Sequence, residues 1–141
     1  MRGLPEQIEE GLLAELRFNL EASSRGIIVC SPPAGTVFDF VAVSRGRCFR
    51  VQVKGSTPRS HPSRGVPSPR LEYHVKLEGK YGRHNIDVLA VLCKDTGQWH
   101  FTTGDEISGR RDARIRHSTT KGPRNSKAPA IQWTDWSIFN H

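Results

Sequence analysis

The sequence predicts an α/β domain with a mixed central sheet of about five strands flanked by helices. Two observations support this fold class. Residues 5–25 carry apolar side chains at the spacing of an amphipathic helix, and from residue 27 onward short apolar segments alternate with turns. The chain has 141 residues, which is the size of one domain and enough to bury a core without disulfides. We therefore expect a single domain over residues 1–141, with a mobile basic loop at 55–70 and a basic arm at 108–127.

The first expected element is the helix over residues 5–25. Pro5 suits the first helical turn, where its missing N–H is not needed, and Gly26 suits the C-terminal end. A stripe that we expect to face the sheet consists of Ile8, Leu12, Leu16 and Leu20. Glu15 falls at the margin of this stripe, where a carboxylate can reach the sheet.

Strands are expected wherever β-branched and aromatic residues alternate or run together between turn residues. These segments are residues 27–30, 37–43, 48–54, 71–77, 86–93 and 98–102. The chain ends with Ile131, Trp133, Trp136, Ile138 and Phe139. Side chains of this size should dock back onto the body of the domain or onto a partner subunit.

The second and third segments form a hairpin if the chain turns between Arg45 and Gly46. Residues whose numbers sum to 91 then lie opposite each other, so Asp39 faces Gln52 and Lys54 lies on the same side. A lone carboxylate between two phenylalanines is costly to bury. We therefore expect a cation beside Asp39, either Lys54 or a divalent metal ion.

The composition indicates the class of partner. The net charge is +7 and the isoelectric point about 9.8, which predicts attraction to a polyanion, either nucleic acid or an anionic membrane surface. No segment is long and apolar enough to cross a membrane or to act as a signal peptide, so a cytoplasmic setting is expected. Three widely spaced cysteines, Cys30, Cys48 and Cys93, are expected to be free, buried thiols.

Phe38-Asp39 followed by Gln52-Val53-Lys54, after a helix bearing Glu15, resembles the PD-(D/E)XK nuclease superfamily. The resemblance covers residues 8–57, with a looser match over 81–91. It is most similar to the small intron-encoded homing endonucleases, in which Gln replaces the usual acid, and then to the archaeal-type Holliday junction resolvases. The chain departs from the pattern where Phe38 stands for Pro and Gln52 for Asp or Glu.

The resemblance implies a restriction-endonuclease-like core that hydrolyses DNA with Mg²⁺, for which Mn²⁺ can substitute. By this likeness Asp39, Gln52, the Val53 carbonyl and Glu15 hold the metal, and Lys54 orients or deprotonates the attacking water or stabilises the developing charge. The side chains that we expect to contact DNA are Ser56, Thr57, Arg59, Arg64, Lys80, Arg83, His84, Arg110, Arg111 and Arg114.

Several alternatives remain open at this stage. The substrate is double-stranded or branched DNA, and the enzyme is a homing endonuclease, a junction resolvase or a restriction enzyme. Cutting two strands needs two active sites, so a homodimer or homotetramer is expected. A DNA-binding module with an inactive nuclease fold would instead use Asp39 and Lys54 as a structural ion pair. Gln52 and Glu15 would then be ordinary solvent-facing residues.

Overall fold

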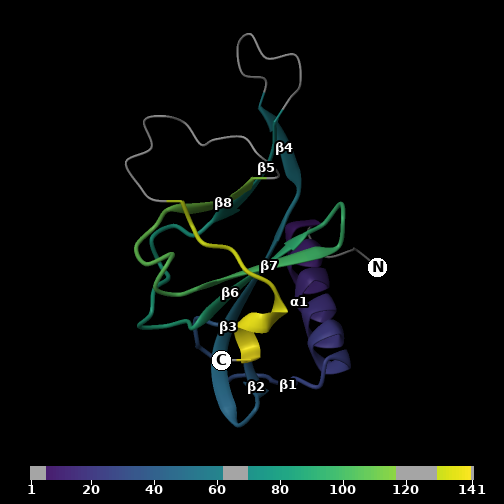
Figure 1. The fold of residues 1–141 in the computed structure, drawn as a ribbon, viewed down its shortest axis with the longest axis vertical. Helices are drawn as coiled ribbons and strands as arrows, with labels where there is room; N and C mark the ends of the chain where they lie inside the picture. The colour runs from purple at the N-terminus through teal and green to yellow at the C-terminus, as the bar shows by residue number, and fades with distance from the viewer. Residues whose placement is uncertain (1–5, 62–69, 117–129, 141) are drawn as a thin grey trace.

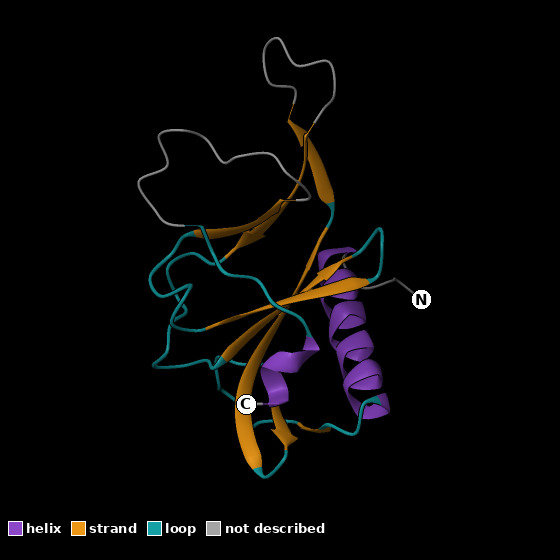
Figure 2. Cartoon of the chain, viewed as in Figure 1, coloured by secondary structure: helices purple, strands orange, loops and turns teal. Residues whose placement is uncertain are grey.

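The computed structural model describes residues 6–61, 70–116 and 130–140, and it confirms the expected α/β class (Figures 1 and 2). The helix α1 (Glu6–Ser24) packs on a five-stranded sheet whose order is β1-β2-β3-β6-β7. Its strands are β1 (Ile28–Cys30), β2 (Phe40–Ser44), β3 (Arg47–Ser56), β6 (Val88–Cys93) and β7 (Gln98–Thr103). The sheet is mixed, because β3 and β6 are parallel while the other neighbours are antiparallel.

A second sheet of three strands lies against the other face, in the order β4-β5-β8. It consists of β4 (Pro58–His61), β5 (Arg70–Lys76) and β8 (Asp112–Arg116). Near the C-terminus, the short 3-10 helix η1 (Trp136–Asn140) lies beside β7. The chain passes from β3 through Thr57 directly into β4. The two sheets are therefore linked through β3, the strand that carries Gln52 and Lys54.

The β2–β3 hairpin has the register that the sequence predicted. Arg45 and Gly46 have φ values of 51° and 76°, which is the type I′ turn that suits a two-residue hairpin loop. Phe40 pairs with Val51, and each further pair keeps the same sum of residue numbers. The start of the strand was predicted wrongly, since β2 begins at Phe40 and not at residue 37.

Two apolar clusters occupy the two faces of the central sheet. Under α1, Phe18 lies 5.7 Å from Phe40, 5.6 Å from Trp99 and 5.7 Å from Trp136, measured between ring centroids. Between the two sheets lie Tyr73, Val75, Leu77, Leu89, Val91, Ala113 and Ile115. The C-terminal aromatics Trp136 and Phe139 join the first cluster, so docking onto the body of the domain is confirmed.

The predicted orientation of α1 is wrong. Ala14, Phe18 and Ala22 face the sheet, whereas the leucines predicted to face it are exposed to solvent. Small side chains at Ala14 and Ala22 let the helix approach the sheet closely, and Phe18 fills the space between them. The more conspicuous leucine periodicity marks the opposite face of the same helix. The side chain of Ile8 lies outside the described part of the structure.

The basic loop and basic arm were also predicted too broadly. Residues 58–61 form β4, and residues 112–116 form β8 with Ala113 and Ile115 buried. Glu72 of β5 balances the charge, because its Oε1 lies 3.6 Å from the Arg114 Nε and 3.4 Å from the Arg116 Nε. Residues 62–69 and 117–129, the remainder of the loop and most of the arm, lie outside the described residues.

Two smaller expectations had different outcomes. Cys93 is buried, but Cys30 and Cys48 are exposed, so the prediction of three buried thiols is wrong for two of them. Among the described residues, no helix is long and apolar enough to span a membrane.

Candidate active site

Asp39 lies where β2 and β3 diverge. Its backbone N–H donates to the Val51 carbonyl at 2.9 Å, and its carboxylate Oδ2 accepts the Val53 N–H at 2.9 Å. The side chain therefore takes a position that a backbone carbonyl would fill in a regular ladder, which explains why β2 begins only at Phe40. Phe38 and Phe40 consequently pack on opposite faces of the sheet. The carboxylate is fixed on the backbone of β3 between Gln52 and Lys54.

Glu15 approaches Asp39 from α1. Burial, a side-chain hydrogen bond with Asp39 and the negative charge of Asp39 raise the pKa of Glu15 to about 7. Two carboxylates in hydrogen-bond contact share a proton, or else a cation must neutralise them. Glu15 thus reaches the sheet from the margin of the helix, as the sequence predicted. It does so although the leucines of the helix face solvent.

Gln52 and Val53 continue the site along β3. Gln52 is buried at 7% exposure, so it is not an ordinary solvent-facing residue, and its side-chain Oε1 has no hydrogen-bond partner among the described residues. A buried amide oxygen without a donor is unfavourable unless another group satisfies it. Val53 packs its side chain in the cluster under α1. Its N–H holds Asp39 at the same point of the strand.

Lys54 lies two residues beyond Gln52, and its partner is the Tyr81 ring and not Asp39. Its Nζ lies 5.6 Å from the centroid of the Tyr81 ring, a cation–π arrangement. Within the described part of the chain, no ion pair joins Lys54 to Asp39. A structural ion pair across the hairpin therefore does not explain why both residues are there.

The donor set fits a hard divalent cation. Among the described residues, no three His, Cys, Asp or Glu side chains gather at one place, so an ion would need other ligands as well. Two adjacent carboxylates on Asp39 and Glu15, with the unpartnered Gln52 Oε1, offer oxygen atoms of the kind that Mg²⁺ and Mn²⁺ prefer. The Val53 carbonyl is the fourth predicted donor.

The predicted DNA contacts fall into three groups. Thr57, Lys80, Arg83, His84, Arg111 and Arg114 are exposed, and Arg110 is partly buried with its Nε donating to the Glu106 carbonyl at 3.0 Å. Ser56 is buried and its hydroxyl donates to the His74 carbonyl at 2.8 Å, so it links β3 to β5 and is not available to a phosphate. The Arg59 side chain and Arg64 lie outside the described part.

Sequence reasoning assigned no role to Arg50, which organises the basic turn beside the site. Its guanidinium donates to both Asp87 carboxylate oxygens at 3.1 and 3.0 Å, and to the carbonyls of His84 and Arg83 at 3.0 and 2.9 Å. The turn is thus fixed by its backbone while the side chains of Arg83 and His84 remain exposed. The available signal was the alternation of β3, which puts Arg50 on the same face as Gln52 and Lys54.

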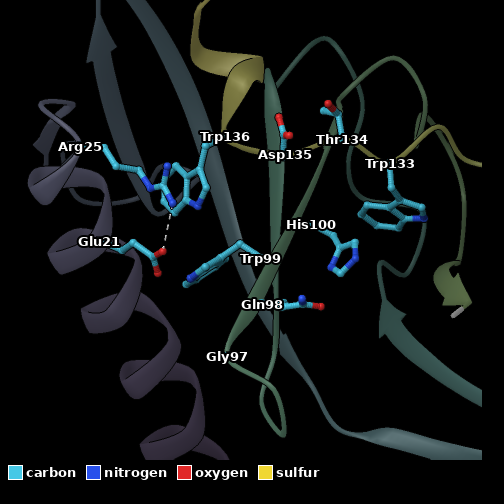
Figure 3. A pocket seen from close by; sticks show the side chains of 10 residues that line it. All are labelled: Glu21, Arg25, Gly97, Gln98, Trp99, His100, Trp133, Thr134, Asp135 and Trp136. Atoms are coloured by element: carbon cyan, nitrogen blue, oxygen red, sulfur yellow. Dashed lines mark ion pairs between the residues drawn. The ribbon is translucent and has the colours of Figure 1, made fainter.

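A cavity of about 630 Å³ lies elsewhere, between the C-terminal half of α1, β7 and residues 133–136 (Figure 3). Arg25 lies 4.8 Å from the Trp136 ring centroid at its rim and pairs with Glu21 at 3.5 Å. None of the residues predicted for catalysis lines this cavity. The cavity forms where the C-terminal segment packs on β7, and neither Glu15 nor Asp39 lines it.

Comparisons with known proteins identify a family and a shared fold. Residues 6–138 match the family described as PD-(D/E)XK endonuclease. Among solved structures, the chain is similar to a bacterial homing endonuclease, I-Ssp6803I, with a TM-score of 0.64 and 18% sequence identity. That match covers 86% of this chain and 84% of the other, and it shows a shared fold. No curated protein sequence matches the chain.

Proposed function

Because the chain belongs to the PD-(D/E)XK endonuclease family, we propose that it hydrolyses phosphodiester bonds of double-stranded DNA with a divalent metal ion, Mg²⁺ or in its place Mn²⁺. The observation that carries the proposal is the contact between the Glu15 and Asp39 carboxylates, with Asp39 fixed to the Val53 N–H on the strand that also carries Gln52 and its unpartnered Oε1. This group of oxygen atoms lies on the strand whose next residue is Lys54. A binding module without catalysis has no need for two adjacent carboxylates.

In this proposal Asp39, Glu15, Gln52 and the Val53 carbonyl hold the ion. When bound, it would polarise the scissile phosphate and lower the pKa of the attacking water. The Val53 N–H keeps the Asp39 carboxylate oriented, since it donates to Oδ2. Glu15 must lose its proton before it can serve as a ligand, because its pKa is about 7 in the metal-free chain.

Lys54 supplies the positive charge. Its ammonium group would donate a hydrogen bond to the attacking water or to the phosphate oxygen that gains charge in the transition state. The face of the Tyr81 ring beside Nζ attracts the positive charge of the ammonium group and limits its freedom. Among the described residues, no carboxylate forms an ion pair with Lys54.

The DNA backbone would be bound by the exposed basic side chains near this strand. Arg83 and His84 lie on the turn that Arg50 fixes, and Lys80 lies just before it. Arg111 lies next to β8, and Arg114 lies on it. The net charge of +7 supports binding that weakens as salt is added. The long basic segments and the likeness to a homing endonuclease favour a specific duplex site over a branched structure.

The proposed test uses the full chain, a supercoiled plasmid, a library of random duplexes and a synthetic four-way junction, each with Mg²⁺, Mn²⁺ or EDTA. We expect selection of one duplex sequence from the library and cleavage only with metal. Asp39→Asn and Lys54→Met should lose activity by at least about 10²-fold. Glu9→Gln is the matched control, because Glu9 is an exposed carboxylate on the same helix.

Each outcome separates one function from another. Paired cuts in the junction without duplex cleavage would make the chain a resolvase. Binding that falls steeply with salt, without cleavage in any metal, would make it a binding module. Cleavage that survives both Asp39→Asn and Lys54→Met would remove these residues from the active site.

We further propose that the active enzyme is a homodimer or homotetramer. One Asp39 and one Lys54 serve one scissile phosphate, so cutting both strands of a duplex in one binding event requires a second site. This requirement leads to the question of which surface joins two copies.

A further inference from the structure

The outer face of α1 is apolar where a surface helix is normally polar. Leu12, Leu13, Leu16 and Leu20, here called the leucine stripe, are exposed by 45%, 56%, 58% and 74%. At about 100° per residue, their mean direction is opposite that of Ala14, Phe18 and Ala22, which face the sheet. Figure 1 shows α1 along one side of the molecule, with the sheet against its inner face. A contiguous apolar patch of this kind marks an interaction surface.

We propose that the leucine stripe binds the same stripe of a second copy of this chain, with the two α1 helices antiparallel. This inference rests on the oligomer suggested above and names its contact surface. Leu12, Leu16 and Leu20 are evenly spaced by four residues, so a two-fold axis through Leu16 brings Leu12 of one copy against Leu20 of the other. The pattern is thus self-complementary, as an isologous interface requires.

The charges along α1 favour this direction. Residues 6–10 contain three glutamates and no basic residue, whereas residues 17–25 contain Arg17 and Arg25 against Glu21. An antiparallel pair places the acidic end of each helix beside the more basic end of the other and aligns the helix dipoles favourably. A parallel pair would put six glutamates together. Charge complementarity therefore selects a second copy in one orientation.

The size of the patch is also appropriate. Four half-exposed leucines supply apolar surface on the order of the 300–600 Å² that on monomers is often functional. The flanking side chains of a helix about 28 Å long can extend this toward the ~800 Å² that each partner contributes to a standard interface. Since α1 also carries Glu15, the pairing would fix two active sites relative to each other.

The first test is the mass of the full chain in solution, measured by sedimentation without DNA. We expect at least a dimer for the wild type, and half that mass or less for the double variant Leu16→Glu/Leu20→Glu with its circular dichroism unchanged. The matched control is Ile28→Glu, which changes an equally exposed apolar side chain on β1 and should keep the wild-type mass. A monomeric wild type, or equal dissociation by Ile28→Glu, would overturn the proposal.

Cross-linking tests the register. With Cys30 and Cys48 changed to serine, Leu16→Cys should form an intermolecular disulfide, because residue 16 lies on the two-fold axis. Leu20→Cys should not, since its two copies would lie roughly 12 Å apart, beyond the reach of a disulfide. The reverse result would refute the two-fold axis at Leu16.

Activity distinguishes this inference from the function proposed for the site. The monomeric leucine double variant should still nick a plasmid that carries the selected duplex sequence, but it should no longer linearise that plasmid. A wild type that dimerises without cutting DNA would refute the nuclease and leave the interface. A wild type that linearises DNA as a monomer would refute the interface and leave the nuclease.

Discussion

The Glu15–Asp39 contact makes the stability of the metal-free protein depend on pH in a calculable direction. Folding raises the pKa of Glu15 from 4.5 to about 7 through burial, the hydrogen bond with Asp39 and the charge of Asp39. An acid whose pKa rises on folding holds its proton more tightly in the folded chain. It therefore contributes stability below pH 4.5, and that contribution is lost as the pH rises to about 7.

The magnitude follows from the size of the shift. At about 1.4 kcal/mol per pKa unit, the difference between 4.5 and about 7 corresponds to a ceiling of about 3.5 kcal/mol. Glu15 is only partly buried, and solvent screening reduces this to roughly 1–2 kcal/mol. Glu15→Gln cannot ionise, so the variant should not show this loss. The wild type without metal should become less stable relative to Glu15→Gln between pH 4.5 and 7.5.

Urea unfolding in EDTA across this pH range measures the effect, with Glu9→Gln as the control that should keep the wild-type profile. Addition of Mg²⁺ at pH 7.5 should restore stability to the wild type and not to Glu15→Gln. Parallel stability profiles for the wild type and Glu15→Gln in EDTA would refute the reasoning, because the two carboxylates would then not be coupled. A stabilising effect of Mg²⁺ on both proteins would remove Glu15 from the ligand set.

Three further predictions concern the fold and the DNA surface. Phe18→Ala should lower the free energy of unfolding by about 3–5 kcal/mol, whereas Leu20→Ala in dilute protein should change it by less than about 0.5 kcal/mol, both by urea titration. Burial raises the pKa of Asp87, but the hydrogen bonds and the charge of Arg50 outweigh burial, so the pKa lies below its usual value. Wild-type stability should therefore fall more steeply than that of Asp87→Asn as the pH drops below 4 in thermal scans. Arg83→Ala should reduce the slope of log K against log salt by about 0.9 in DNA-binding titrations without metal, and an unchanged slope would mean that this side chain contacts no phosphate.

The hairpin could be predicted from the sequence because its causes are local. A two-residue turn at Arg45-Gly46 determines which residues pair, and the pairing follows from counting. That register brought Asp39 beside the strand of Gln52 and Lys54 before any coordinates were known. The early end of β2 could not be foreseen, because it depends on a carboxylate replacing a carbonyl as the acceptor for Val53.

The orientation of α1 could not be predicted because two periodic faces compete. A stripe of leucines ordinarily faces the core, and here Phe18 with two alanines does so instead. Burial at Ala14 and Ala22 depends on how closely the helix approaches the sheet, which a one-dimensional pattern does not contain. The leucines with the more conspicuous period form the exposed face of the helix.

The second sheet was missed for an electrostatic reason. Ala113 and Ile115 alternate in the sequence as in a strand, but the arginines around them favour an exposed arm. Glu72, which lies 42 residues before Arg114 and 44 before Arg116, pairs with both arginines and makes the basic strand compatible with a sheet. Long-range ion pairs of this kind are absent from local patterns, so net charge over a short segment is weak evidence against a strand.

The arrangement of β3 explains how so few residues can make a site. Its alternate side chains have separate tasks: Val51 and Val53 hold the strand under α1, while Arg50, Gln52 and Lys54 face the other way. The strand is central, paired with β2 on one side and β6 on the other, so its backbone cannot shift without breaking both ladders. Asp39 is attached to that backbone at Val53, and Arg50, three residues earlier on the same strand, attaches the basic turn. In the function proposed above, the metal-binding oxygens and the turn that would contact DNA are thereby held to one rigid element, which is the preorganisation that phosphodiester hydrolysis needs.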